Sequence, residues 1–355
     1  MLAPPPLAGS GGHRTVYRNL NALAGAGFRV EVHVEGRRLR PGWLETARTR
    51  QLFEVSDDIG LTPGWPGGLD EADLVLATTW QSALHLGKLK TSGLKAHFVQ
   101  DYECLFYPEE DERSALARSV HDLGFPSITI GNWLVEVLSR EHGLTAWPTP
   151  FSADLELYAG DFTPPASRQK VVVANYQPEK PRRCPEVMES SLQLVLDDDP
   201  AVEVVTFGSR RSPGLSGNHR HLGLIDPGTL ATLYREAGAG LSMSATNPSR
   251  VPFEMMAAGL PVVELGGDNT ILDLPEQACL LAEAEPKAVA AALSRVLVDE
   301  QEGARRSLAA SEFMSLRDRS VETEAFVEAV RDLISGKPPS TDGQEPLYRA
   351  RFLSA

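Results

Sequence analysis

The chain has 355 residues, too many for one compact core of ordinary size, so two domains are expected. With 42% hydrophobic and 23% charged residues it has the composition of a globular protein and not of a disordered one. A formal net charge of -14 argues against nucleic acid as a partner and leaves at most peripheral contact with a membrane.

The cysteine pattern and the hydropathy pattern narrow the class further. Cys104, Cys184 and Cys279 are scattered, with no C-x-x-C spacing, which favours a reducing compartment and argues against a metal site. No apolar run reaches the ~18 residues of a spanning helix, and the first residues lack the basic and apolar regions of a signal peptide. The expected location is therefore the cytoplasm.

Strand and helix patterns alternate along the first 150 residues. Apolar groups at helical spacing predict a helix over 15–28 that stops at Gly27, and strict alternation predicts a half-buried strand over 29–36. The further expected elements are strands at 72–80, 96–102 and 126–132 and a helix at 132–143. This alternation predicts a doubly wound parallel sheet.

A proline-containing segment without apolar periodicity separates this half from a second one. The domain boundaries that we predict are 1–150, a linker at 151–169, a second domain at 170–335 and a polar tail at 336–355. In the second domain strands are expected at 170–176, 201–209, 239–245 and 261–267, and helices at 185–199, 227–238, 253–259, 286–311 (broken near Gly303) and 320–335. The prediction is an α/β protein with two Rossmann-like halves.

A glycine-rich run, GSGGHR at 9–14, stands directly before the first expected helix. Glycines let a backbone approach an anion closely and a helix N-terminus favours negative charge, so Gly11, Gly12 and His13 are candidate phosphate contacts. A flexible connector is the alternative. G-x-G-x-x-G is absent and MLAPPP is not a clear strand, which argues against a nicotinamide oxidoreductase.

Polar residues follow two other expected strands at their carboxyl ends, where open α/β sheets bind ligands. In HFVQDYE these include Asp101 and Glu103, which could also belong to a solvated loop. In NYQPEKPRRCPE they are Lys180, Arg182 and Arg183, which suit a diphosphate but could equally pair with glutamates on a surface turn. The acidic run DDDP at 197–200 lies at the opposite end of the sheet and is interpreted as a helix-terminating turn.

The run NPSRVPFEMMAAGLPVVE, at 247–264, places one acid, Glu254, at the start of a small-residue helix. A carboxylate there can bridge the two hydroxyls of a ribose with charge-assisted hydrogen bonds. Acids are also favoured in the first turn of any helix, so a purely structural cap is the alternative.

Together, SMSATNPSRVPFEMMAAGLPVVE, HFVQDYE, NYQPEKPRR and GSGGHRTVYRNLNALAGAGFRVEV resemble glycosyltransferase family 4 of the GT-B fold, and in particular a bacterial rhamnosyltransferase-like subgroup. The resemblance covers roughly residues 9–330. It implies two Rossmann-like domains facing across a cleft, with the acceptor bound by the N-terminal domain and the nucleotide-sugar donor mainly by the C-terminal one. It also implies a retaining, metal-independent transfer without a cofactor, from a nucleoside-diphosphate sugar to a glycan, lipid-linked or natural-product acceptor.

The resemblance further implies roles for single residues. Glu254 would hold the ribose, and Arg182, with Lys180 or Arg183 as alternates, would meet the diphosphate. Gly11 and Gly12 would face the diphosphate from the N-terminal domain, and Asp101 and Glu103 would lie on the sugar or acceptor side.

Two positions depart from the family pattern. Thr246 stands where most relatives carry a glutamate near the transferred sugar, and Gln177 stands where a basic residue is common. These departures support one alternative, an inactive GT-B subunit that binds or scaffolds. A sugar-nucleotide epimerase of the same fold is a further alternative, although no extra catalytic acids can be assigned to it.

Overall fold

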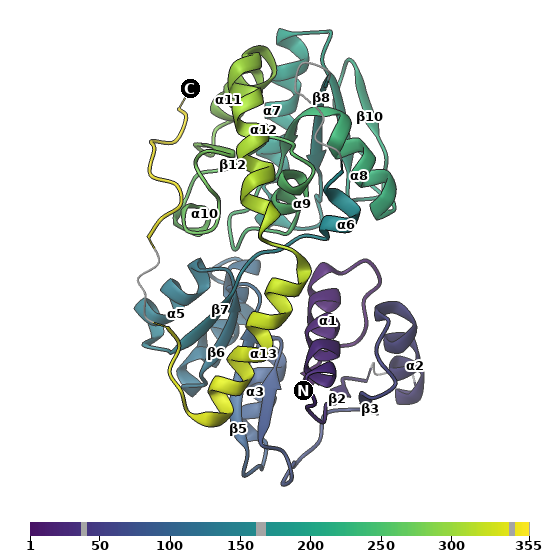
Figure 1. Cartoon of the computed structure of the whole chain (residues 1–355), viewed down its shortest axis with the longest axis vertical. Helices are drawn as coiled ribbons and strands as arrows, with labels where there is room; N and C mark the ends of the chain where they lie inside the picture. The colour runs from purple at the N-terminus through teal and green to yellow at the C-terminus, as the bar shows by residue number, and fades with distance from the viewer. Residues whose placement is uncertain (37–40, 161–167, 341–344, 355) are drawn as a thin grey trace. The chain divides into compact units, whose positions relative to one another are not determined.

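The computed structural model describes residues 1–36, 41–160, 168–340 and 345–354 (Figure 1). The chain divides into two compact units. Unit 1 comprises Met1–Pro150 and Glu322–Gly343, and unit 2 comprises Phe151–Val321 and Gln344–Ala355. Each unit is built on one parallel sheet.

The sheet of unit 1 has seven strands in the order β3-β2-β1-β4-β5-β6-β7. The strands are β1 (Leu2–Ala3), β2 (Glu31–Val34), β3 (Gly60–Pro63), β4 (Leu74–Ala77), β5 (Leu94–Val99), β6 (Ser127–Ile130) and β7 (Ala146–Thr149). The helices are α1 (Gly11–Gly25), α2 (Gly42–Phe53), α3 (Trp80–Lys88), η1 (Glu103–Phe106), α4 (Glu112–Ser119), η2 (Val120–Leu123) and α5 (Trp133–His142). Because β1 lies between β2 and β4, the winding reverses at β1, as in a Rossmann sheet.

The sheet of unit 2 has six strands in the order β10-β9-β8-β11-β12-β13. The strands are β8 (Gln169–Asn175), β9 (Glu203–Phe207), β10 (His219–His221), β11 (Ala237–Leu241), β12 (Val262–Leu265) and β13 (Cys279–Ala282). The helices are α6 (Leu155–Tyr158), η4 (Pro181–Arg183), α7 (Pro185–Asp198), α8 (Pro227–Glu236), α9 (Val251–Ala257), α10 (Asp268–Ile271), α11 (Pro286–Val298) and α12 (Glu300–Ser315). Numbered within the unit, this is the strand order 3-2-1-4-5-6 of dinucleotide-binding sheets.

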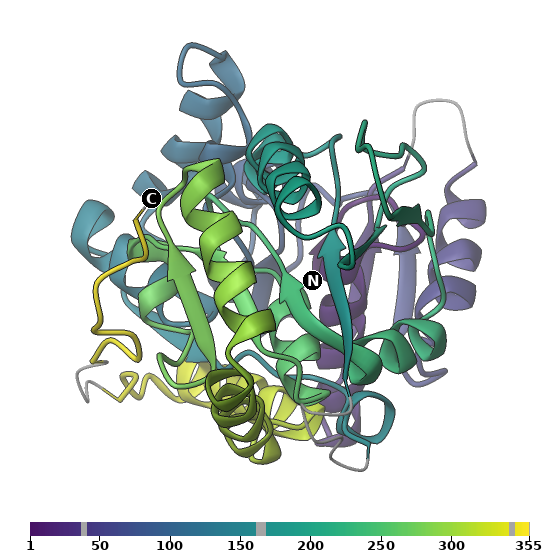
Figure 2. The same ribbon diagram turned by 90° about the horizontal axis from the view of Figure 1, so that it is seen from above.

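Helices flank the sheet of unit 2 on both faces (Figures 1 and 2). Helices α7 and α11 pack on each other and, with one face of the sheet, enclose a core of valine, leucine and alanine side chains. Helices α8 and α9 pack together and contact β11, and α12 packs on α9. The predicted doubly wound α/β class is therefore confirmed in both units.

The division into units differs from the boundaries predicted at 151–169 and 335. The described part of the predicted linker contains α6, and Ala153 pairs with Asp318 in unit 2. Helix α13 (Arg319–Ser335) starts in unit 2 and continues in unit 1, where Phe326 packs on Phe98 with ring centroids 5.0 Å apart. The apolar face of α13 thus belongs to the first unit, because its partners lie there.

The break in the predicted long helix lies at Asp299 and not near Gly303. The Asp299 carboxylate accepts a hydrogen bond from the N–H of Glu302 at 3.0 Å and so caps α12. Gly303 instead allows close approach of α11 and α12, because an added Cβ would lie 3.0 Å from the carbonyl oxygen of Val296.

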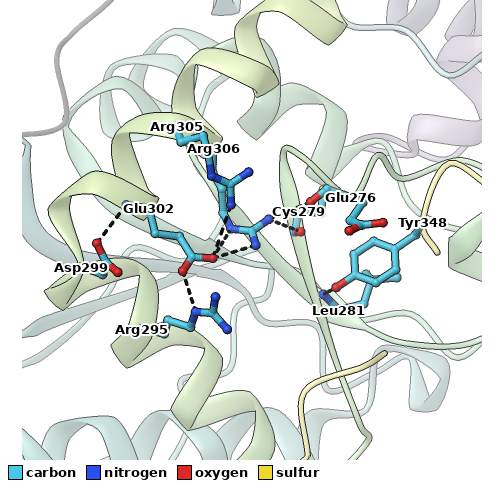
Figure 3. Close-up of polar contacts among 9 residues, drawn as sticks. All are labelled: Glu276, Cys279, Leu281, Arg295, Asp299, Glu302, Arg305, Arg306 and Tyr348. Carbon is cyan, nitrogen blue, oxygen red and sulfur yellow. Dashed lines mark hydrogen bonds and ion pairs between the residues drawn. The ribbon is translucent and has the colours of Figure 1, made fainter. Parts of the chain in front are cut away.

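A buried ion pair and the C-terminal segment both contact β13, the edge strand of the unit 2 sheet (Figure 3). The guanidinium of Arg306 binds the Glu302 carboxylate, at 2.8 Å, and donates to the carbonyl oxygen of Cys279 at 2.6 Å. In the segment predicted as a polar tail, the Tyr348 hydroxyl accepts from the N–H of Leu281, and Leu353 pairs with Ala282. This part of the tail therefore pairs with the edge strand β13 on the side opposite to β12.

Among the helices of the described residues, none has the length and hydropathy needed to cross a membrane.

Candidate functional site

The strand order of unit 2 marks one place for a ligand. The winding reverses between β8 and β11, which are adjacent and parallel. In open α/β sheets, the loops that leave the carboxyl ends of such a strand pair diverge and leave a ligand site between them. The segments after β8 and after β11 are therefore the first candidates in this unit.

Three predicted cations lie in the segment after β8. Lys180 is half-buried and donates to the side-chain oxygen of Gln177 at 3.1 Å. Burial, together with the positive charges of Arg182 and Arg183, lowers the pKa of Lys180 to about 8. Arg182 and Arg183 form the short turn η4 directly before α7. Positive charge is thus concentrated at the carboxyl end of β8.

The structure joins this basic segment to the loop after β11. The carbonyl oxygen of Arg182 accepts from the N–H of Ala245 at 2.9 Å. The Arg183 guanidinium, only 9% exposed, donates to the hydroxyl of Ser244 at 2.6 Å. The Ser244 hydroxyl in turn contacts the carbonyl oxygen of Asn247 at 2.8 Å. Residues about sixty positions apart in the chain therefore form one polar cluster at the point where the winding reverses.

Glu254 and Thr246 lie on the continuation of the same loop. Glu254 is the fourth residue of α9 and is half-buried. Thr246 is buried, 1% exposed, and its carbonyl oxygen accepts from the side-chain amide of Asn269. Helix α9 lies close to the sheet at Gly240, where an added Cβ would stand 2.6 Å from the sulfur of Met255. Helix α9 thus packs closely on the sheet at the end of the loop that bonds Arg182 and Arg183, and the ribose role of Glu254 stays a prediction.

Sequence reasoning gave no role to Glu264, which the structure places in this cluster. Glu264 is fully buried at the end of β12, and its Oε1 accepts from the N–H of Ser244 at 2.8 Å. Burial raises its pKa to about 8. The available signal was an acid inside an otherwise apolar strand, because such a group is retained only with hydrogen-bond partners.

In unit 1 the glycine-rich run forms the first turn of a helix. Gly11 starts α1, and the hydroxyl of Ser10 accepts from the N–H of His13 at 3.3 Å. The His13 ring contacts that hydroxyl at 2.9 Å and the carbonyl oxygen of Pro5 at 3.1 Å, and burial lowers its pKa. An added Cβ at Gly12 would lie 3.3 Å from the side-chain oxygen of Gln100. The helix start and the end of β5 therefore meet.

Asp101 and Glu103 both line a small pocket within unit 1. The pocket lining also includes Thr78, Trp80, His97, Gln100 and His121. Glu103 accepts from the N–H of Trp80 at 2.5 Å, at the first residue of α3. Asp101 accepts from the N–H of Tyr102 at 2.9 Å. Glu103 therefore stabilises a helix start, whereas the catalytic role predicted for both acids is not tested by these contacts.

Within the described parts of the chain, no group of three or more histidine, cysteine or acidic side chains is arranged to hold a metal ion.

Comparisons with known proteins agree with this fold. Residues 170–294 match the family described as WsaF, C-terminal domain. The chain is 33% identical over 297 residues to the O-antigen biosynthesis protein RfbC of Myxococcus xanthus. That alignment covers 82% of this chain but only 22% of RfbC, so the chain corresponds to a minor part of the relative.

Solved structures that resemble most of the chain include HepE and WaaG. HepE of Anabaena, in complex with UDP and glucose, matches with a TM-score of 0.68 and 16% identity, over 94% of this chain and 99% of HepE. WaaG, a glycosyltransferase involved in lipopolysaccharide biosynthesis, matches with a TM-score of 0.60 and 12% identity, over 95% of this chain and 100% of WaaG. These similarities confirm the predicted GT-B architecture.

Proposed function

We propose that this chain is a glycosyltransferase that moves a sugar from a nucleoside-diphosphate donor to a glycan acceptor during the assembly of a cell-surface glycan. The observation that carries the proposal is the polar cluster where the winding of the unit 2 sheet reverses. There the Arg183 guanidinium donates to the Ser244 hydroxyl, and the carbonyl oxygen of Arg182 accepts from the N–H of Ala245. Fold similarity alone cannot assign the reaction, because one fold hosts many activities. The similarity to RfbC, an O-antigen biosynthesis protein, favours glycan assembly.

In this proposal each part of the unit 2 cluster has a separate task. Arg182, Arg183 and Lys180 offset the negative charge of the diphosphate, which grows on the leaving group as the bond to the sugar breaks. Glu254 holds the ribose through charge-assisted hydrogen bonds to both hydroxyls. Thr246 lies in the loop between β11 and α9, next to Ala245, whose N–H donates to the carbonyl oxygen of Arg182. The donor is thus held by its ribose and by its diphosphate, which is the leaving group of the transfer.

Unit 1 contributes an anion-binding helix start and an acidic pocket. The first turn of α1, with Gly11, Gly12 and His13, presents backbone N–H groups of a 15-residue helix. Asp101 and Glu103 serve the sugar or acceptor side. We further propose that transfer retains the anomeric configuration, needs no divalent metal and uses a deoxyhexose such as rhamnose as the donor sugar, as the family 4 resemblance implies.

An assay of donor turnover with and without acceptor tests the proposal. UDP-, GDP- and dTDP-sugars are incubated with the protein and glycan acceptors, and both the diphosphonucleoside and the glycosylated product are quantified. We expect release of the nucleoside diphosphate that depends on the acceptor, together with an equal amount of glycosylated product. Binding without release would indicate the inactive scaffold, and interconversion of the donor sugar without acceptor would indicate an epimerase.

A matched pair of variants links turnover to the cluster. Arg182→Ala removes a cation of the basic segment, whereas Arg220→Ala removes an exposed arginine that pairs with Glu203 between neighbouring strands. Only the first variant should lower turnover. Equal activity of the two variants would contradict the assignment of the donor site to the end of β8.

A further inference from the structure

Glu264 is an ionisable group buried where the surrounding chain is apolar. It is 0% exposed, and Val263 and Leu265 beside it in β12 are also buried. Removing a carboxyl group from water is costly unless hydrogen bonds replace those of the solvent. A hydrophobic residue would serve packing at this position better, so the contacts of Glu264 indicate its purpose.

Those contacts lead from β12 to the basic segment after β8. Glu264 Oε1 accepts from the N–H of Ser244 at 2.8 Å and from that of Leu265 at 2.9 Å. This fixes the backbone of Ser244 just after β11. The Ser244 hydroxyl, held between the carbonyl oxygen of Asn247 and the guanidinium of Arg183, then orients Arg183 at 2.6 Å. The carboxyl group of Glu264 therefore links β12 to the loop after β11 and, through Ser244, to the segment after β8.

We propose that Glu264 is a positioning residue for the donor diphosphate, because it fixes Ser244 and, through Ser244, the guanidinium of Arg183. The inference rests on the proposed function, since it assumes that the basic segment binds a diphosphate. Glu264 does not touch the ligand in this arrangement. Its effect is to hold one cation in the orientation that the ligand requires.

The charges around Glu264 determine the form in which it acts. Arg183 faces it from η4, Cys184 from the start of α7 and Cys279 from β13, and Ser242 is a further hydrogen-bond partner. Burial raises the pKa of Glu264 to about 8 even though Arg183 lowers it, and burial also raises the pKa of both thiols. At pH 7 Glu264 is therefore mostly protonated and cancels little of the positive charge of Arg183.

A pH dependence of ligand binding follows. A diphosphate near Arg183 disfavours a second negative charge at Glu264, so binding favours the protonated carboxyl. Affinity should fall as pH rises through about 8, when the empty site loses this proton. The pKa of Lys180 lies in the same range, so its contribution has to be removed before that of Glu264 can be measured.

The positioning step is tested by calorimetry on the full chain with UDP, GDP and dTDP and with the matching nucleosides. Ser244→Ala should weaken diphosphonucleoside binding about tenfold or more while nucleoside affinity changes by less than about twofold. The control is Glu302→Gln, which disturbs the buried pair with Arg306 shown in Figure 3 and should leave both affinities unchanged. Urea unfolding verifies that each variant is folded.

Two outcomes of this experiment are distinguishable. If none of the three diphosphonucleosides binds the wild type, the proposed function fails together with this inference. If one binds and Ser244→Ala binds it equally well, only the positioning role is overturned.

The second test isolates Glu264 by its titration and does not depend on Ser244→Ala folding. The parent is Lys180→Arg, which keeps a cation that does not titrate in this range, and the second variant adds Glu264→Gln. Glutamine can accept the same two backbone hydrogen bonds but cannot ionise. Between pH 7 and 9 the affinity of the parent for the bound diphosphonucleoside should fall by up to about tenfold more than that of the double variant. Parallel pH profiles would overturn the linkage between the proton of Glu264 and ligand binding.

Discussion

Two histidines in unit 1 should make this unit sensitive to acid. His97 and His121 are each 4% exposed and stack with ring centroids 6.0 Å apart. Burial lowers the pKa of His97 to about 3, with His121 adding to the effect. Burial lowers that of His121 to about 4, helped by the neighbouring His142. Replacing His121 with phenylalanine keeps a ring in the stack and removes one titrating group.

The direction and the size of the stability change with pH follow from proton linkage. Both folded pKa values lie below the ordinary value of 6.5, so the unfolded chain binds more protons as pH falls, and folding free energy is lost below about pH 6.5. At pH 5, one and a half units below the unfolded pKa, each neutral histidine costs about 2 kcal/mol. Wild type should therefore lose about 2 kcal/mol more than His121→Phe between pH 7.5 and 5.

Tryptophan fluorescence during urea unfolding measures this difference in the relevant unit. All five tryptophans of the chain belong to unit 1, namely Trp43, Trp65, Trp80, Trp133 and Trp147. Free energies of unfolding are compared for wild type and His121→Phe at several pH values, and proton NMR of the histidine rings follows their ionisation directly. Free energies that change in parallel with pH, or a His121 resonance that titrates near pH 6.5, would refute the reasoning.

Three further predictions concern the donor site. Glu254→Gln should raise the donor dissociation constant by about one to three decades with little change in stability, because charge-assisted hydrogen bonds to ribose are weakened. A purely capping role predicts instead a loss of about 0.3–1 kcal/mol in stability and unchanged affinity. Calorimetry measures the affinity and urea unfolding measures the stability. Arg182→Ala should weaken UDP binding far more than uridine binding, and equal losses in calorimetry would show that Arg182 does not contact phosphate. EDTA should leave transferase activity intact, and a loss restored by Mg²⁺ or Mn²⁺ would contradict metal independence.

The sequence was sufficient to predict the fold class, because that class follows from local patterns of apolar and polar residues. Alternating residues predict β2, apolar runs predict β8 and β12, and helical spacing predicts α5 and α7, each within a few residues of its observed bounds. The short elements were harder to predict from the sequence. Strand β1 has only two residues, too few for any periodicity, and is recognisable as a strand only through its pairing with β2 and β4.

The candidate site was predictable as a set of positions, since polar residues after parallel strands collect at one sheet edge. Lys180, Arg182 and Arg183 were found in this way, and the structure joins Arg182 and Arg183 to the loop that leads to Glu254. The contact of Glu103 with the start of α3 was not predictable, because it depends on two segments that only the folded sheet brings together.

Sequence by itself thus determined the alternation of elements, the two Rossmann-like halves and the residue types available at each strand end. Tertiary structure alone decided that Arg183 meets Ser244, that Glu264 is buried beneath that contact, and that α13 joins the first unit and not the second. The physical reason is the sequence separation over which each kind of interaction acts. Periodicity and turn chemistry act over a few residues, whereas burial and hydrogen-bond partners depend on strand order, which joins residues about twenty to sixty positions apart in this site.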